Sequence, residues 1–142
     1  MLEDEGISVL LKEYREAIDY TWKIMKFYSV TEACSKCAEK EPGGCCFQGV
    51  ETWYSDIQFL INILMGVNIP VTPMFNKSCM FVGETGCRLL CRNAFCINFL
   101  CDKIKKNMSG KDMEKLNHAS AKEIDCGIRL ENLIIKWLSI EL

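Results

Sequence analysis

Residues 7–30 read ISVLLKEYREAIDYTWKIMKFYSV, and the spacing of their apolar side chains indicates the fold class. Leu11, Tyr14 and Ile18 lie three or four positions apart, and Met25 continues the same series. Because an α-helix has about 3.6 residues per turn, this spacing places these side chains on one face of a helix. The stretch therefore predicts an amphipathic helix of about six turns, with charged residues mostly on its other face.

Residues 55–65 and 111–140 carry the next two helical signals. Ser55 and Gln58 form a capping-box pair at the start of the shorter segment, and Gly66 stands where a left-handed C-terminal cap is expected. Residues 111–140 repeat apolar side chains at helical spacing. Both segments therefore predict helices that bury one face.

The remaining segments complete the expected fold. Residues 92–106 begin apolar and end basic, which suits a helix because basic side chains complement its negative C-terminal dipole. Residues 34–49 have no periodicity and contain the turn signal Pro-Gly-Gly, so a loop is expected there. Residues 79–86 predict a turn or a short strand pair. The expected fold class is mainly α, a small helical bundle of about four helices with two Cys-rich metal-binding loops.

Length and composition limit the classes of function. The 142 residues are expected to form one domain, residues 1–142. A net charge of −2 argues against a nucleic-acid partner, and no apolar run approaches the ~18 residues of a membrane span. The acidic start of the chain lacks the features of a secretory signal. We therefore expect a cytoplasmic protein with an unknown protein partner.

The ten cysteines are the unusual feature of this composition, and they fall into two groups. The first group follows the helix predicted at residues 7–30, the second follows the helix predicted at residues 55–65, and one cysteine stands apart in the last segment. In chain order they are Cys34, Cys37, Cys45 and Cys46, then Cys79, Cys87, Cys91, Cys96 and Cys101, and lastly Cys126.

The spacing within the groups favours metal ligation. A C-x-x-C pair such as Cys34 and Cys37 lets both sulfurs approach one metal while backbone amides donate to them. The adjacent pair Cys45–Cys46 is hard to place on one tetrahedral zinc ion and suits a multinuclear cluster, two neighbouring sites, or one ligand beside a structural thiol. Disulfides in an oxidising compartment are the alternative, and ten free thiols after metal removal would exclude them.

This pattern resembles the YkgJ-like family of zinc- or iron-chelating domains, which has a C-x-x-C…CC motif and is related to the Cys-rich domain of flagellin lysine-N-methylases. The first group matches that motif, Cys79-Met80-Phe81-Val82 is similar to the family's C-x-F-L element, and residues 92–96 are similar to its R-P-x-x-C element, with Asn93 in place of proline. The resemblance implies eight metal ligands: Cys34, Cys37, Cys45, Cys46, Cys79, Cys87, Cys96 and Cys101.

The other candidate residues favour no additional chemistry. Cys126 lies among apolar neighbours and is expected to be a buried apolar residue, while Cys91 can be either a ligand or a core residue. His118, the only histidine, is expected at the surface, so a hydrolytic triad is not expected. Trp53 and Tyr54 can either shield a metal centre from water or anchor the helix that follows them.

Three functions remain open at this point. The first is a protein that holds an iron–sulfur cluster for a redox, electron-transfer or accessory role, and many soft ligands and adjacent cysteines favour it. The second is a structural zinc-binding interaction module, since zinc needs only four thiolates per site. The third, an enzyme domain like that of the methylases, rests on the resemblance alone, so enzymatic activity is left undecided.

Overall fold

The computed structural model describes residues 1–39, 48–98 and 100–141. Side chains are described for all of these except residues 34, 35, 37–39, 102, 103 and 141. Within this part of the chain the structure forms six α-helices, one 3-10 helix and a two-stranded antiparallel sheet. The helices are α1 (Glu5–Phe27), α2 (Val30–Glu39), α3 (Asp56–Leu64), α4 (Ala94–Asn98), α5 (Asp102–Lys106) and α6 (Gly110–Glu141), with η1 at Val50–Trp53 and strands β1 (Val82–Gly83) and β2 (Gly86–Cys87).

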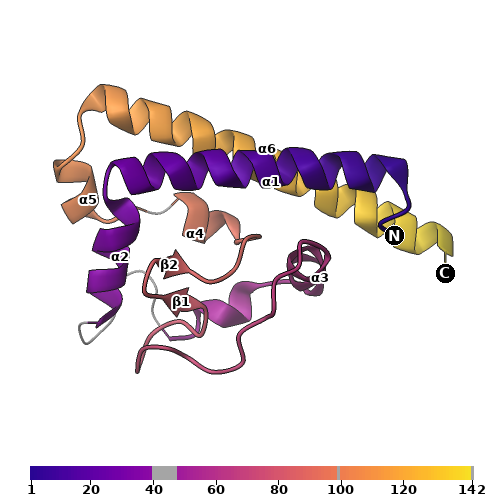
Figure 1. Cartoon of the computed structure of the whole chain (residues 1–142), viewed down its shortest axis with the longest axis horizontal. Coiled ribbons are helices and arrows are strands. Elements are labelled where there is room, and N and C mark those ends of the chain that lie inside the picture. The colour runs from indigo at the N-terminus through magenta and orange to yellow at the C-terminus, as the bar shows by residue number, and fades with distance from the viewer. Residues whose placement is uncertain (40–47, 99, 142) are drawn as a thin grey trace.

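The two long helices, α1 and α6, lie side by side and antiparallel, and the smaller elements pack along one side of this pair (Figure 1). Asp4 caps α1 by accepting a hydrogen bond from the backbone N–H of Ile7 at 3.0 Å. The face predicted from residues 7–30 is the buried one and forms the main core with α6 and α3. This core contains Ile7, Leu11, Tyr14, Ala17, Ile18, Ile61, Met65, Cys91, Cys126, Leu130 and Ile134.

The predicted loop at residues 34–49 is wrong over its first part, because Cys34 and Cys37 belong to helix α2. Ser29 has a left-handed backbone with a φ of 58°, which ends α1 and redirects the chain into this second helix. Among the α2 side chains that the structure describes, only Val30 is buried, and the sequence of the segment has no apolar period to reveal the helix. The residues of the Cys45–Cys46 pair lie outside the described residues.

The predictions around α3 and the hairpin are confirmed. Ser55 and Gln58 form the capping box, with the Ser55 hydroxyl accepting from the Gln58 backbone N–H at 3.2 Å. Gly66 follows with a φ of 85°, as a left-handed cap requires. The short strand pair predicted near residues 79–86 corresponds to β1 and β2.

The single helix predicted at residues 92–106 is wrong, because two short helices, α4 and α5, replace it. Cys101 has an extended backbone, with φ −71° and ψ 160°, and begins α5 instead of continuing α4. Leu100 and Ile104 join a second core cluster with Ile24, Met25, Val30, Leu116 and Ala119.

The mainly α class is confirmed, whereas the count of four helices and the arrangement as a four-helix bundle are not. The pair of long helices, α1 and α6, supports a separate layer of short helices and the β1–β2 hairpin (Figure 1). That layer has its own core of Val50, Tyr54, Cys79, Phe81, Val82 and Leu89. None of the helices in the described residues has the length and apolar composition needed to cross a bilayer.

Candidate metal centre

Three of the predicted ligands line one pocket between the β1–β2 hairpin, α4 and the C-terminal part of α1. Cys79 precedes β1, Cys87 ends β2, and Cys96 lies in α4, so three segments of the chain each supply one thiol. The other walls are mostly apolar. The cavity has a volume of about 50 Å³, below the ~300–1,000 Å³ of pockets that hold organic ligands. A small inorganic group suits this space better than an organic substrate does.

Backbone amides point at two of these sulfurs. The N–H of Phe81 donates to Cys79 Sγ at 3.5 Å, and the N–H of Leu89 donates to Cys87 Sγ at 3.4 Å. In both cases the donor lies two residues after the cysteine. Hydrogen bonds of this kind favour the thiolate over the thiol and stabilise sulfur ligands of metal centres.

Tyr54 interacts with two of the thiols. Its hydroxyl is 3.9 Å from Cys96 Sγ and also interacts with Cys87. Its ring stacks on Phe59 at 5.6 Å between centroids and meets Phe81 edge-on at 5.3 Å. Tyr54 therefore lines the pocket and also belongs to the core that contains Val50 and Phe81.

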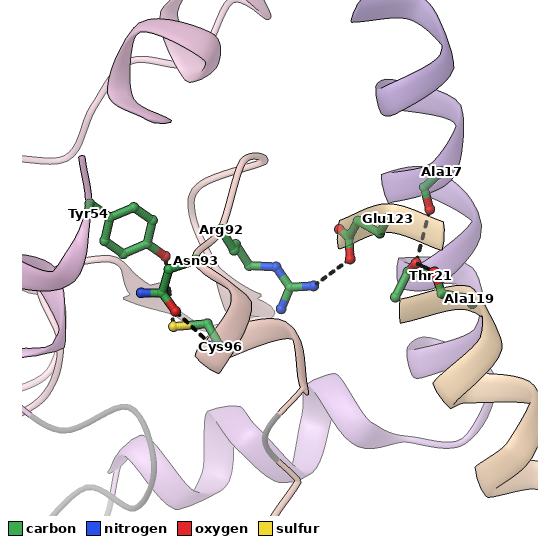
Figure 2. A network of polar contacts seen from close by, with 8 residues as sticks. All are labelled: Ala17, Thr21, Tyr54, Arg92, Asn93, Cys96, Ala119 and Glu123. Carbon is green, nitrogen blue, oxygen red and sulfur yellow. Dashed lines mark hydrogen bonds and ion pairs between the residues drawn. The ribbon is translucent and has the colours of Figure 1, made fainter. Parts of the chain in front are cut away.

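Asn93, the residue just before α4, holds the backbone of Cys96 in place (Figure 2). Its side-chain oxygen accepts from the backbone N–H of Cys96 at 2.8 Å, as an N-cap side chain does. The YkgJ-like family, which the sequence resembles in this segment, has proline at this position. Proline can start a helix but offers no such side-chain oxygen, so asparagine here fixes the first turn of α4 by a hydrogen bond.

Arg92 connects this pocket to the long helical pair (Figure 2). Its Nη2 lies 3.5 Å from Glu123 Oε2 in α6, and its guanidinium lies 4.6 Å from the ring centroid of Trp22 in α1. The side chains of Arg92 and Glu123 are only 4% and 0% exposed. A charged pair buried to this degree loses nearly all of its hydration.

Several polar atoms of this network have no hydrogen-bond partner among the described residues. They are Nε and Nη2 of Arg92, Nδ2 of Asn93 and both carboxyl oxygens of Glu123. Arg92 Nη2 and Glu123 Oε2 face each other in the ion pair, so Arg92 Nε and Asn93 Nδ2 are the donors left without an acceptor among the described residues. Buried polar atoms in folded proteins normally have partners, so these two donors beside the pocket point to an additional acceptor. Burial raises the pKa of Glu123 to about 7, although Arg92 opposes this shift.

Burial also affects the protonation state of the three thiols that line the pocket. It raises the pKa of Cys79 to about 11, and it raises the pKa values of Cys87 and Cys96 as well. The hydrogen bonds from Phe81 and Leu89 act in the opposite direction on Cys79 and Cys87. These three cysteines are therefore neutral thiols near pH 7 unless a cation displaces their protons.

Helix α2, whose backbone includes Cys34 and Cys37, approaches the same pocket. This helix contacts both strands of the hairpin, and its Thr31 lines the pocket. Cys34 follows Thr31 by about one helical turn. The side chains of Cys34 and Cys37, like residues 45 and 46, lie outside the described residues, so their part in the site stays a prediction.

The other three cysteines are not brought to this pocket. Cys101 lines a separate groove between α2 and α5, with Val30 and Ile104 among its walls. Cys91 and Cys126 are buried in the main core, 1% and 2% exposed. Cys91 interacts there with the Tyr14 hydroxyl. The expected burial of Cys126 is confirmed, and the exposed His118 agrees with its predicted place at the surface.

The donor set fits a soft metal in its chemistry, although it is incomplete within the described residues. Three thiols, a tyrosine hydroxyl and a buried cation surround the pocket, and thiolate sulfur suits zinc and iron–sulfur centres. In the described part of the chain, no group of three or more His, Cys, Asp or Glu side chains could hold a metal ion as it stands. A metal centre at this pocket would need further ligands, and the first cysteine group is their predicted source.

Sequence reasoning missed Glu123 entirely. The apolar period along residues 111–140 points to Ile124 on the core face, but Glu123 is fully buried and Ile124 is only half-buried. A glutamate beside an apolar face gives no signal of burial, because glutamate is normally exposed. The burial of Glu123 is explained by its ion pair with Arg92, which comes from a distant part of the sequence.

Comparisons of the chain with protein-family models, curated proteins and solved structures found no match.

Proposed function

We propose that this chain is a metal-binding protein that holds an iron–sulfur centre through clustered Cys thiolates and serves a redox, electron-transfer or accessory role. One observation carries the proposal. Cys79, Cys87 and Cys96 come from separate segments to one small pocket, and two of their sulfurs accept backbone N–H groups. Converging soft donors with amide support are what such a centre requires.

The proposed ligand set extends beyond these three residues. The resemblance to the YkgJ-like family adds Cys34, Cys37, Cys45, Cys46 and Cys101. The contact of α2 with the hairpin supports the addition of Cys34 and Cys37, because it brings their helix beside the pocket. Cys101 has the weakest support, since it lines a different groove. Thiolate ligation of this kind persists in a reducing compartment such as the cytoplasm.

Iron–sulfur chemistry is preferred to zinc on the number and placement of the thiols. A single structural zinc site needs four ligands, whereas this chain offers eight candidates that include an adjacent pair. A bound cluster would supply one-electron redox chemistry, and the protein would supply the apolar, hydrogen-bonded surroundings that set its potential. A structural zinc module remains the alternative, favoured by the small volume of the pocket.

Metal analysis of protein purified without oxygen tests this proposal, combined with acid-labile sulfide and a visible spectrum. Iron with sulfide and a broad absorption that bleaches on reduction is the expected result. A colourless protein with stoichiometric zinc would replace the redox role with that of an interaction module. Protein with neither metal after isolation, and none after reconstitution, would overturn both.

A further inference from the structure

Arg92 carries a positive charge that the described residues only partly balance. Its side chain is 4% exposed, and its ion pair with Glu123 spans 3.5 Å. The Nε and Nη2 atoms make no hydrogen bond within the described part of the chain. A buried guanidinium normally satisfies its donors in full, so this arrangement indicates that part of its electrostatic role lies elsewhere.

The position of Arg92 shows where that role lies. Arg92, Cys87 and Cys96 line the same pocket, while Glu123 meets the guanidinium from the α6 side. Trp22 offers a ring face at 4.6 Å, which holds the cation but supplies no net charge. The guanidinium therefore stands between a single carboxyl group and the cluster of sulfurs.

We propose that Arg92 is a positioning residue of the metal centre, whose positive charge compensates the negative charge of the sulfur ligands, and that Glu123 controls how much of this charge the centre receives. This inference rests on the proposed metal-binding function and deepens it. A divalent metal bound by four thiolates carries a net negative charge, and so do most thiolate-bound clusters. In a buried pocket that charge needs a nearby cation.

The arrangement predicts that removing the charge of Arg92 and removing the charge of Glu123 change the metal affinity in opposite directions. Loss of the Arg92 charge leaves the anionic centre uncompensated and weakens metal binding. Loss of the Glu123 charge removes the competing anion, so more of the arginine field acts on the sulfurs and metal binding becomes tighter. General damage to the fold weakens binding in both variants, so the opposite signs separate the electrostatic role from a structural one.

The test is a titration of the reduced, metal-free full chain with Co²⁺ in competition with a chelator, because Co²⁺–thiolate complexes absorb visible light. Arg92→Met is expected to weaken Co²⁺ binding by about tenfold, the usual scale for groups that support ligands. Arg92→Lys keeps the charge and should recover most of that loss. Glu123→Gln should bind Co²⁺ more tightly than the original chain, by a few-fold.

Arg129→Met is the matched control, because Arg129 also lies beside a cysteine: its Nη2 is 3.4 Å from Cys126 Sγ, outside the proposed centre. Its Co²⁺ affinity should equal that of the original chain. Circular dichroism checks the fold of each variant, and if Arg92→Met does not fold, the sign of the Glu123→Gln effect decides. Unchanged or weaker binding in Glu123→Gln overturns the proposal while leaving metal binding intact. Absence of Co²⁺ binding in the original chain overturns this inference, whereas the iron, sulfide and zinc analysis decides the proposed function separately.

Discussion

Asn62 holds both backbone polar groups of Cys91. Its Oδ1 accepts from the Cys91 N–H at 2.9 Å, and its Nδ2 donates to the Cys91 carbonyl oxygen at 2.9 Å. Oδ1 also accepts from the Leu90 N–H, and Nδ2 donates to the Gln58 carbonyl within α3. The side chain is fully buried. The Asn62 side chain therefore connects residues 90 and 91 to α3. This connection fixes the direction from which Arg92 enters the pocket.

Asn62→Ala is expected to destabilise the fold strongly. The change removes four hydrogen bonds and leaves the buried backbone groups of residues 90 and 91 unpaired, which costs roughly 2–5 kcal/mol of unfolding free energy. Urea unfolding measures the loss. Asn132→Ala, at an exposed position of α6, should change stability by less than about 0.5 kcal/mol. Equal losses in the two variants would contradict the role given to Asn62.

Glu123 should make the stability of the metal-free protein depend on pH. Its pKa is raised in the folded state from 4.5 to about 7, so the folded protein binds the proton more tightly than the unfolded chain does. This stabilisation is fully present below about pH 4.5 and is lost as the pH rises through about 7. Between pH 5 and pH 8, Glu123→Gln should therefore gain on the order of 1–3 kcal/mol relative to the original chain.

Chemical unfolding at each pH measures this effect. Glu114→Gln serves as the control, because Glu114 is an exposed glutamate on the same helix. Its stability should stay parallel to that of the original chain across the range. Parallel curves for Glu123→Gln as well would show that the buried carboxyl group does not titrate between pH 5 and pH 8.

Tyr54→Phe tests the contribution of the hydroxyl group separately from that of the ring. The ring contacts with Phe59 and Phe81 remain, so the stability loss should stay within about 0.5–1.5 kcal/mol. The centre loses the hydroxyl that lies 3.9 Å from Cys96 Sγ. If iron is bound, its midpoint potential should fall, because a hydrogen-bond donor near sulfur favours the reduced, more negative state. Tyr14→Phe, beside the core residue Cys91, should leave the potential unchanged; a matching shift there would contradict the assignment of Tyr54.

The elements with a strong apolar period could be predicted from the sequence. The helices at α1, α3 and α6 and the capping box of Ser55 follow from local spacing, and local packing preserves them. α2 could not be predicted, because its sequence has no apolar period and it follows a left-handed residue, Ser29. The break between α4 and α5 likewise depends on tertiary packing, which overrides the helical tendency of residues 92–106.

The sequence predicts which residue types form the candidate site, but it does not predict which of the cysteines lie together in one pocket. The sequence identifies Cys79, Cys87 and Cys96 as related, yet it treats Cys101 as equivalent to them. Only the extended backbone at Cys101, which starts a new helix, separates that thiol from the pocket. The link from Arg92 to Glu123 spans 31 positions of the chain, and no periodic pattern reports a contact of that kind.

The metal content of matched cysteine variants tests the central claim most directly. Purified without oxygen, Cys87→Ser and Cys96→Ser should lose most of the metal bound per chain, and so should Cys34→Ser and Cys37→Ser. Cys126→Ser, which changes a buried core thiol outside the pocket, should keep the metal content of the original chain. Equal metal content in all five variants would contradict the assignment of these cysteines as ligands.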